Sequence, residues 1–217
     1  MIDRHTRLAR SITFEQLGIE IGPYFNPTLP KRLGYRCLVL DVFDATTLRK
    51  HAASDPNLSK TAIANIEKVD LVSPATSIAT LIVEKHRLGS FDYIVSSHNI
   101  EHVPDPIRFL QGCEQVLLPG GLLSMAKPDR RTCFDYFRPH TILTDFLEAY
   151  FQSRDRPSPA LVFTQNSLHS RYAVGDRQLE SFRCTTTPRT SFPRVIVIDG
   201  SEPRELVEGG GRCVVAV

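Results

Sequence analysis

The chain has 217 residues, of which 41% are hydrophobic and 23% are charged, and its formal net charge is +2. These values fit one soluble globular domain with a sizeable core, and they exclude a transmembrane span and a long basic nucleic-acid-binding block. Residues 1–10 carry charge throughout and do not resemble a signal peptide, so we expect a cytoplasmic protein with no membrane or nucleic-acid partner.

The cysteine pattern predicts free thiols in a reducing compartment and no metal site. The five cysteines are odd in number, and no two of them form a Cys-x-x-Cys pair. They are scattered along the chain as Cys37, Cys113, Cys133, Cys184 and Cys213.

The first third of the chain predicts three strands. Residues 1–16 are mixed and basic, and we expect a short helix or a mobile lead-in there. Residues 17–23 form a brief apolar strand that ends in glycine and proline, and residues 36–41 form a second buried strand that ends on Asp41. Asp44 is placed to cap a short helix. Residues 66–72 predict the third strand, with Asp70 near its end.

The middle of the chain continues the alternation. A helix begins at Ser73-Pro74, turns Ile78, Leu81 and Ile82 to one side, and stops at Gly89. Residues 91–95 are a fourth, central strand.

Residues 105–126 predict another helix and the fifth strand. Asp105 is a candidate N-cap with Pro106 at the first helical position. The triplet Pro119-Gly120-Gly121 is expected to end this helix, and residues 122–126 follow as a strand. The expected buried face of the helix is Ile107, Leu110, Cys113 and Leu117.

The pattern loosens after Asp129. Residues 141–151 have helix-like spacing, residues 154–159 read as a linker, and residues 161–193 show no firm period and are expected to be partly disordered. Residues 194–199 and 212–217 are strand candidates for a terminal hairpin.

Alternating strands and helices predict an α/β fold: a doubly wound, mostly parallel sheet with helices on both faces. We expect an N-terminal lead-in over residues 1–16, a Rossmann-like core over residues 17–153 and a divergent C-terminal segment over residues 154–217.

Polar residues at the predicted strand ends indicate a ligand site, because ligands of such sheets bind beyond the carboxyl ends of the strands. Gly22 allows close approach of the backbone, and Asp41 can accept two hydrogen bonds from ribose hydroxyls. Residues 96–102 add hydroxyls, imidazoles, an amide and a carboxylate. The alternatives are a simple turn glycine and structural helix caps. A nicotinamide-dependent oxidoreductase is a rival, but no Gly-x-Gly-x-x-Gly sequence is present to hold a pyrophosphate.

Four segments resemble the class I S-adenosylmethionine-dependent methyltransferases. They are residues 18–23 (GIEIGP), 39–42 (VLDV), 91–103 (FDYIVSSHNIEHV) and 116–122 (VLLPGGL), and the resemblance runs from about Leu17 to about Arg138. The last two segments are the more specific. Residues 134–139 (FDYFRP) resemble a type 11-like bacterial branch. Tyr24 and Asn26 stand where the family usually has further glycines.

The resemblance implies S-adenosylmethionine as cofactor and assigns its contacts. Residues Glu20, Gly22 and Pro23 would line its methionine end, and Asp41 would hold its ribose. Asp70 and Leu71 would flank the adenine, and Ser97 and His98 would lie near the sulfonium. The resemblance also implies a seven-stranded sheet whose last strand is antiparallel.

A general base would assist transfer to an oxygen acceptor, and His98 and His102 are the candidates. In a tight turn they share one face, and Glu101 is placed to orient one of them. The alternatives are a structural role for His102 and a histidine metal pair, which lacks a third ligand at a sensible spacing.

We expect a small-molecule or sugar-type methyl acceptor. The alternative function is a noncatalytic methyltransferase-like binding or scaffold module.

Overall fold

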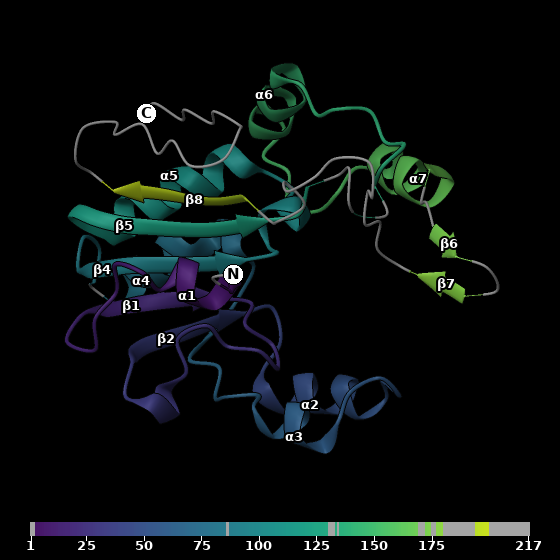
Figure 1. Ribbon diagram of the computed structural model, residues 1–217. Coiled ribbons are helices and arrows are strands. Elements are labelled where there is room, and N and C mark those ends of the chain that lie inside the picture. Colours follow the sequence, from purple (N-terminus) through teal and green to yellow (C-terminus); the bar gives the residue numbers. More distant parts are fainter. Residues whose placement is uncertain are drawn as a thin grey trace.

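The computed structural model describes residues 3–85, 87–129, 133, 135–168, 172–174, 177–179 and 194–199. Its centre is a six-stranded sheet in the order β3-β2-β1-β4-β5-β8 (Figure 1). The first five strands in this order are parallel, and β8 pairs antiparallel with β5. The strands are β1 Leu17–Ile21, β2 Arg36–Asp41, β3 Leu71–Val72, β4 Phe91–Ser97, β5 Leu117–Lys127 and β8 Arg194–Asp199.

Helices and short 3-10 turns connect the strands. The helices are α1 Arg4–Leu8, α2 Ala45–Ala53, α3 Lys60–Ala64, α4 Ile78–Glu84, α5 Pro106–Val116, α6 Leu143–Phe151 and α7 Pro159–Leu168. The 3-10 turns are η1 Lys31–Leu33, η2 Ala75–Ser77 and η3 Ile100–His102, and a separate hairpin joins β6 Tyr172–Val174 to β7 Arg177–Leu179. The predicted α/β class with a mostly parallel sheet is confirmed.

Different helices cover the two faces of the sheet (Figure 1). On one face, α4 and α5 bury Ile78, Ile82 and Phe109 against the strands. On the other face, α1 inserts Leu8, which is 1% exposed, beside Tyr93 and Val95 of β4. From Tyr93 to Val95, successive residues of β4 therefore alternate between two separate cores, as buried parallel strands do.

The loop after β1 packs at a third cluster near the edge of the sheet. Tyr24 and Phe25 contact each other edge-to-face at 5.0 Å between ring centroids and pack against Leu48, Ala52 and Ile66. Helix α2 begins where expected, because the Asp44 side chain accepts the Thr47 N–H at 2.7 Å. The cluster holds α2 and α3 beside the carboxyl end of β2.

The third strand is shorter than the sequence predicts: only Leu71 and Val72 pair with β2, over Leu40 and Asp41. Before it, the Asp70 N–H still donates to the Val39 carbonyl at 2.9 Å, and carboxylate side chains also bond the neighbouring backbone. Asp70 accepts the Val39 N–H at 2.9 Å, and Glu67 accepts the Lys31 N–H at 3.1 Å.

Helix α5 has a different buried face from the predicted one. Ile107 and Leu117 are only partly buried and Leu110 is 37% exposed. Gly112 explains the difference: a Cβ there would lie 2.9 Å from Ile78 Cγ2, so α5 turns its glycine side towards α4. The residues that are buried are Phe109, Gly112, Cys113 and Val116.

The Pro119-Gly120-Gly121 triplet does not separate the helix from the strand. Helix α5 ends at Val116, β5 begins at Leu117, and the triplet lies inside β5 where the pairing with β4 shifts register. Gly120 has φ of 80°, which an irregular strand tolerates at glycine.

In the C-terminal part, residues 159–168 form helix α7 where we expected partial disorder. No residue of α7 is buried, so its sequence needs no apolar period. The predicted strand at 194–199 is present as β8, while residues 212–217 lie outside the described residues.

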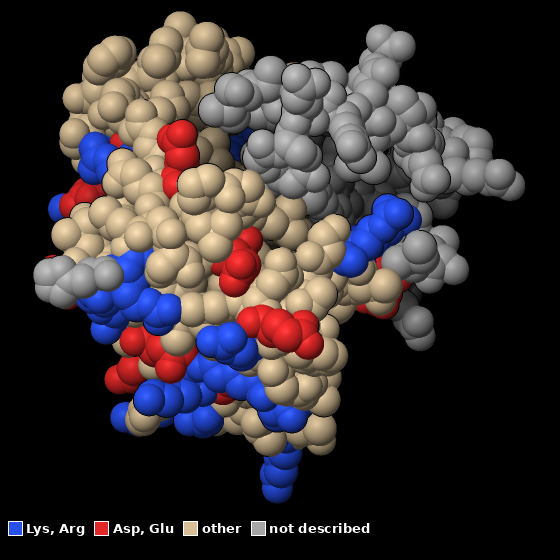
Figure 2. All heavy atoms as spheres, turned by 90° about the vertical axis from the view of Figure 1, so that its left-hand side faces the viewer, with Lys and Arg blue, Asp and Glu red and all other residues tan. Residues whose placement is uncertain are grey.

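Figure 2 shows the face where the parallel strands begin, at the left of Figure 1. Basic and acidic side chains are interspersed over its lower part, whereas the upper part, where α6 lies, is largely uncharged. Exposed apolar residues of α6 include Leu143, Leu147 and Phe151. In the part of the chain that the structure describes, no helix has the length and apolar character needed to cross a membrane.

Candidate active site

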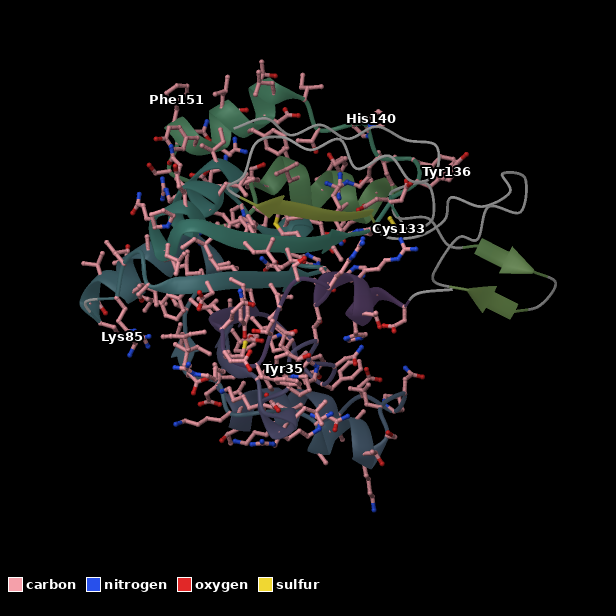
Figure 3. All side chains as sticks on the ribbon, turned by 60° about the vertical axis from the view of Figure 1, so that its left-hand side comes forward. Tyr35, Lys85, Cys133, Tyr136, His140 and Phe151 are labelled. Atoms are coloured by element: carbon pink, nitrogen blue, oxygen red, sulfur yellow. The ribbon has the colours of Figure 1, made fainter. Side chains whose placement is uncertain are left out.

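A cavity of about 1080 Å³ lies beyond the carboxyl ends of β4 and β5. Figure 3 shows Cys133 and Tyr136 at this end of the sheet and Lys85 at the opposite end. The polar lining of the cavity comes from the turn after β4, from the segment after β5 and from α1. The lining includes His98, Glu101, His102, Asp129, Cys133 and His5.

Gly22 ends β1 in an open, left-handed turn. Its φ is 61°, and no heavy atom lies within 4 Å of the position a Cβ would take. Its N–H donates to the Leu40 carbonyl at 2.9 Å, and the carbonyl of half-buried Pro23 accepts the Asn26 N–H at 3.0 Å. Gly22 is exposed, and the close approach of a ligand to its backbone stays a prediction.

Glu20 is held by the loop rather than facing open space. It is 2% exposed, and its carboxylate accepts the Thr28 N–H at 2.6 Å and the Leu29 N–H at 3.0 Å. Burial raises the pKa of this carboxyl above its usual range, although the two backbone hydrogen bonds oppose that shift. The structure therefore shows Glu20 shaping the loop after β1.

Asp41 lies at the carboxyl end of β2 beside the Gly22 turn. It is 8% exposed, and its Oδ1 accepts the Phe43 N–H at 3.1 Å. Burial raises the pKa of Asp41, with the hydrogen bonds from the Phe43 and Val42 backbone acting in the opposite direction. A largely desolvated carboxylate at a strand end is suited to accept hydrogen bonds from a ligand.

Asp70 and Leu71 are engaged within the fold, and neither they nor Asp41 are among the residues that line the cavity. Asp70 precedes β3, where it pairs with Lys31 and accepts the Val39 N–H, and Leu71 is 3% exposed within the core. The carboxyl end of β3 is instead Val72-Ser73, and the Ser73 N–H donates to the Asp41 carbonyl at 2.9 Å.

Three exposed apolar side chains at the carboxyl ends of β2 and β3 were not predicted from the sequence as site residues. Val42 is 54% exposed, Phe43 is 44% exposed and Val72 is 52% exposed, although they adjoin buried strands. The sequence pattern that could have indicated them is an apolar residue that follows the acidic residue near the end of a predicted strand.

The end of β4 carries polar atoms that are buried without a hydrogen-bond partner in the described structure. They are Ser96 Oγ, Ser97 Oγ and Asn99 Nδ2. Unpartnered buried polar groups are costly in a native protein, so their occurrence at successive positions around the end of this strand indicates a ligand or ordered water.

His98 and His102 both line the cavity, as the shared-face hypothesis requires. His98 has φ of 53° and donates its N–H to the Ala126 carbonyl at 2.8 Å. Its Nδ1 lies 3.4 Å from Glu101 Oε1. His102 ends the 3-10 turn η3, where its N–H donates to the Asn99 carbonyl at 2.9 Å.

Two further walls of the cavity come from segments that were not predicted as part of the site. Helix α1 contributes Asp3, Arg4 and His5, and α7 contributes Leu161 and Val162. Neither segment carries a motif, so proximity to the site follows only from how α1 and α7 pack.

Comparison with known proteins agrees with the strand order. A family model described as a methyltransferase domain matches residues 25–125. Together with a parallel sheet in the order β3-β2-β1-β4-β5 and an antiparallel strand next to β5, this match identifies the fold of the class I methyltransferases. Over residues 25–125 the chain is therefore similar to the methyltransferases of this class, whose methyl donor is S-adenosylmethionine.

The more particular relatives match over short stretches. The chain is 40% identical over 42 residues to a ubiquinone biosynthesis O-methyltransferase of Xanthomonas campestris and 46% identical over 41 residues to that of Parvibaculum lavamentivorans. The first match spans 19% of this chain and 18% of the Xanthomonas protein.

Solved methyltransferase structures align over larger fractions at low identity. A SAM-dependent methyltransferase of Aquifex aeolicus aligns over 76% of this chain and 78% of its own, with 12% identity and a TM-score of 0.39. One from Methanosarcina mazei aligns over 59% and 60%, with 20% identity and a TM-score of 0.41. At these TM-scores the fold assignment depends on the strand order and the family match.

Proposed function

We propose that this protein transfers a methyl group from S-adenosylmethionine to a hydroxyl of a small molecule. The observation that carries the proposal is the group of unpartnered buried polar atoms at the end of β4. They lie at the carboxyl edge of the sheet, as do the open Gly22 turn and the buried Asp41 carboxylate. This edge is where sheets of this type bind nucleotide-like ligands.

The residues present fit the cofactor. Asp41 would accept hydrogen bonds from the ribose hydroxyls, and the exposed side chains of Val42 and Val72 would contact the adenine. The Gly22 turn would receive the amino-acid end, and Ser97 Oγ offers a hydroxyl near the sulfonium.

When bound, the cofactor supplies a methyl group that its positive sulfur already activates. The chain has to align the acceptor with that group and remove the acceptor's proton. His98 would take the hydroxyl proton on Nε2, and the Glu101 carboxylate, near Nδ1, would stabilise the charge that the ring then carries.

A small-molecule acceptor is supported by the cavity and, weakly, by the short matches to ubiquinone biosynthesis O-methyltransferases. Apolar residues line one part of the cavity and include Val103, Leu161 and Val162. Such a lining favours an acceptor with an apolar body and a polar reacting group.

Substitution of Asp41 by alanine tests the cofactor site. We expect the affinity for S-adenosylhomocysteine, measured by titration calorimetry, to fall about ten- to a hundredfold, since hydrogen bonds to a charged group are lost. Affinity in the unsubstituted protein should also fall as pH drops through the raised pKa of Asp41, because only the ionised carboxyl accepts both hydroxyls.

Asp155→Ala is the matched control, because Asp155 is exposed in the linker before α7 and its carboxylate pairs only with neighbouring Arg156 among the described ion pairs. Unchanged affinity in Asp41→Ala would remove Asp41 from the ribose role. Absence of any binding by the unsubstituted protein would overturn the enzyme proposal and favour a noncatalytic module.

A further inference from the structure

Helix α1 contacts the loop that follows β1. The Asn26 Nδ2 atom lies 3.1 Å from His5 Nε2, which joins side chains 21 residues apart in the sequence. With the amide nitrogen as donor, Nε2 accepts and Nδ1 carries the ring proton. Asn26 is one of the two residues that stand where the family's loop usually has glycine.

The α1 side of this contact is firmly anchored in the core. Leu8 is 1% exposed, and its carbonyl accepts the buried Ser124 hydroxyl at 2.9 Å. At the other end of α1, the Asp3 side chain accepts the His5 N–H at 2.7 Å. His5 therefore projects from a short helix that is fixed at both ends.

The loop side is held at its two ends by bonds already described. The Gly22 N–H bonds the Leu40 carbonyl, and Glu20 binds the Thr28 and Leu29 N–H groups. Between them the backbone turns left-handed at both Gly22 and Tyr24, with φ of 61° and 48°. Asn26 lies in the middle of this span, where its N–H donates to the Pro23 carbonyl and Tyr24 and Phe25 pack on the third cluster. Its bond to His5 adds a side-chain restraint that ties this part of the loop to α1.

The same helix forms a wall of the candidate active site. His5 lines the cavity together with His98 and Glu101. Tyr93 and Val95 face the α1 core, so by the alternation of β4 the Ser97 side chain projects on that side as well. The unpartnered Ser97 hydroxyl thus lies on the face that α1 covers.

We propose that His5 and Asn26 are positioning residues for S-adenosylmethionine, and that their hydrogen bond holds the loop after β1 in its binding shape. The inference rests on the proposed function. A loop that is already ordered loses less conformational entropy when the ligand binds. The hydrogen bond between the His5 and Asn26 side chains would supply part of this order before the ligand binds.

A double-mutant cycle tests this proposal. The affinity for S-adenosylhomocysteine is measured by titration calorimetry in the full chain, His5→Ala, Asn26→Ala and the double variant. Each single substitution should lower the affinity about fivefold, which corresponds to one net hydrogen bond. The double variant should bind no more weakly than the more affected of the two single variants. His5→Gln, whose amide oxygen can accept from Asn26, should restore most of the affinity.

The controls are His140→Ala and Asn57→Ala, because both residues are exposed and neither lines the cavity. Unchanged affinity in the single variants, effects that simply add, or failure of His5→Gln to restore binding would overturn the proposal. These results differ from a failure of the proposed function, in which the unsubstituted protein itself binds no cofactor.

Discussion

At the scale of single residues, His98 is the least ordinary position in the candidate site. Its φ of 53° is a conformation that residues other than glycine adopt at a cost of about 1–2 kcal/mol. The hydrogen bond from its N–H to Ala126 ties that backbone to the end of β5. The fold thus maintains a strained turn that directs an imidazole into the cavity.

Replacing His98 by asparagine tests the role of the imidazole. Asparagine accepts the left-handed backbone, so the turn should survive while the base is lost. We expect turnover to fall about 10²- to 10⁴-fold with little change in cofactor affinity. The measurement is release of S-adenosylhomocysteine in the presence of a panel of phenols and alcohols.

The same substitution at His102 provides the comparison, since it also lines the cavity but is exposed at the end of η3. A smaller loss is expected there. If His102→Asn proves the more damaging change, the two histidines exchange roles in the proposed mechanism.

At the scale of elements, a glycine fixes how β1 meets β4. Gly18 pairs with Tyr93, whose ring is fully buried and would lie 2.2 Å from a Cβ at position 18. The ring therefore occupies the space that any side chain at Gly18 would need. This contact joins the two central strands from which the site residues of both extend.

Gly18→Ala should accordingly lower the free energy of unfolding by about 1–3 kcal/mol, the range for an overpacked core. Urea unfolding followed by circular dichroism measures the change. The double variant Gly18→Ala/Tyr93→Leu should be less destabilised than the sum of its single variants, because leucine vacates part of the ring's space.

Gly112→Ala is the graded control. Its Cβ would meet one methyl group at 2.9 Å, and alanine also favours the helix, so we expect a smaller loss. Equal losses at the two glycines would argue against the role of the Tyr93 ring.

The elements that the sequence predicted best are those whose signal is local. Strand β2 was predicted with its observed bounds, because it is an apolar run that ends on a charged residue. The predictions failed where tertiary contacts decide. Gly112 turns α5 towards α4, and carboxylates of Glu67 and Asp70 bond the backbone of distant segments just before the short β3.

The candidate site follows the same division. Asp41 and the turn after β4 adjoin the carboxyl ends of parallel strands, so the sheet topology was enough to predict that they lie along the same edge of the sheet. His5 and Val162 reach the cavity only through the packing of α1 and α7, which no periodicity in the sequence records. Asp70 precedes β3 because the observed strand begins only at Leu71, and its contact with the cofactor stays a prediction.

At the scale of the whole molecule, Glu20 should make stability depend on pH. Burial raises its pKa in the folded protein, so the folded state binds more protons than the unfolded state between the two pKa values. The free energy of unfolding should therefore fall as pH rises from the ordinary range of a glutamate through the raised pKa. Buried Asp41 acts in the same direction.

Glu20→Gln isolates this contribution. Its unfolding free energy, measured by urea titration over a pH series, should decline less with rising pH than that of the unsubstituted protein. Glu84→Gln, at an exposed position, should retain the full decline. Parallel curves for Glu20→Gln and the unsubstituted protein would contradict the assignment.

Strand β8 has a consequence for how the chain folds. It pairs with Leu122–Lys127 of β5, although its residues lie more than sixty positions later in the sequence. The parallel strands all lie within residues 17–127. During synthesis the parallel strands are complete before β8 emerges. Until then β5 is an open edge, able to pair with a strand of another nascent chain. The last described strand therefore protects the sheet against aggregation. If β8 pairs slowly with β5, the yield of soluble protein should fall.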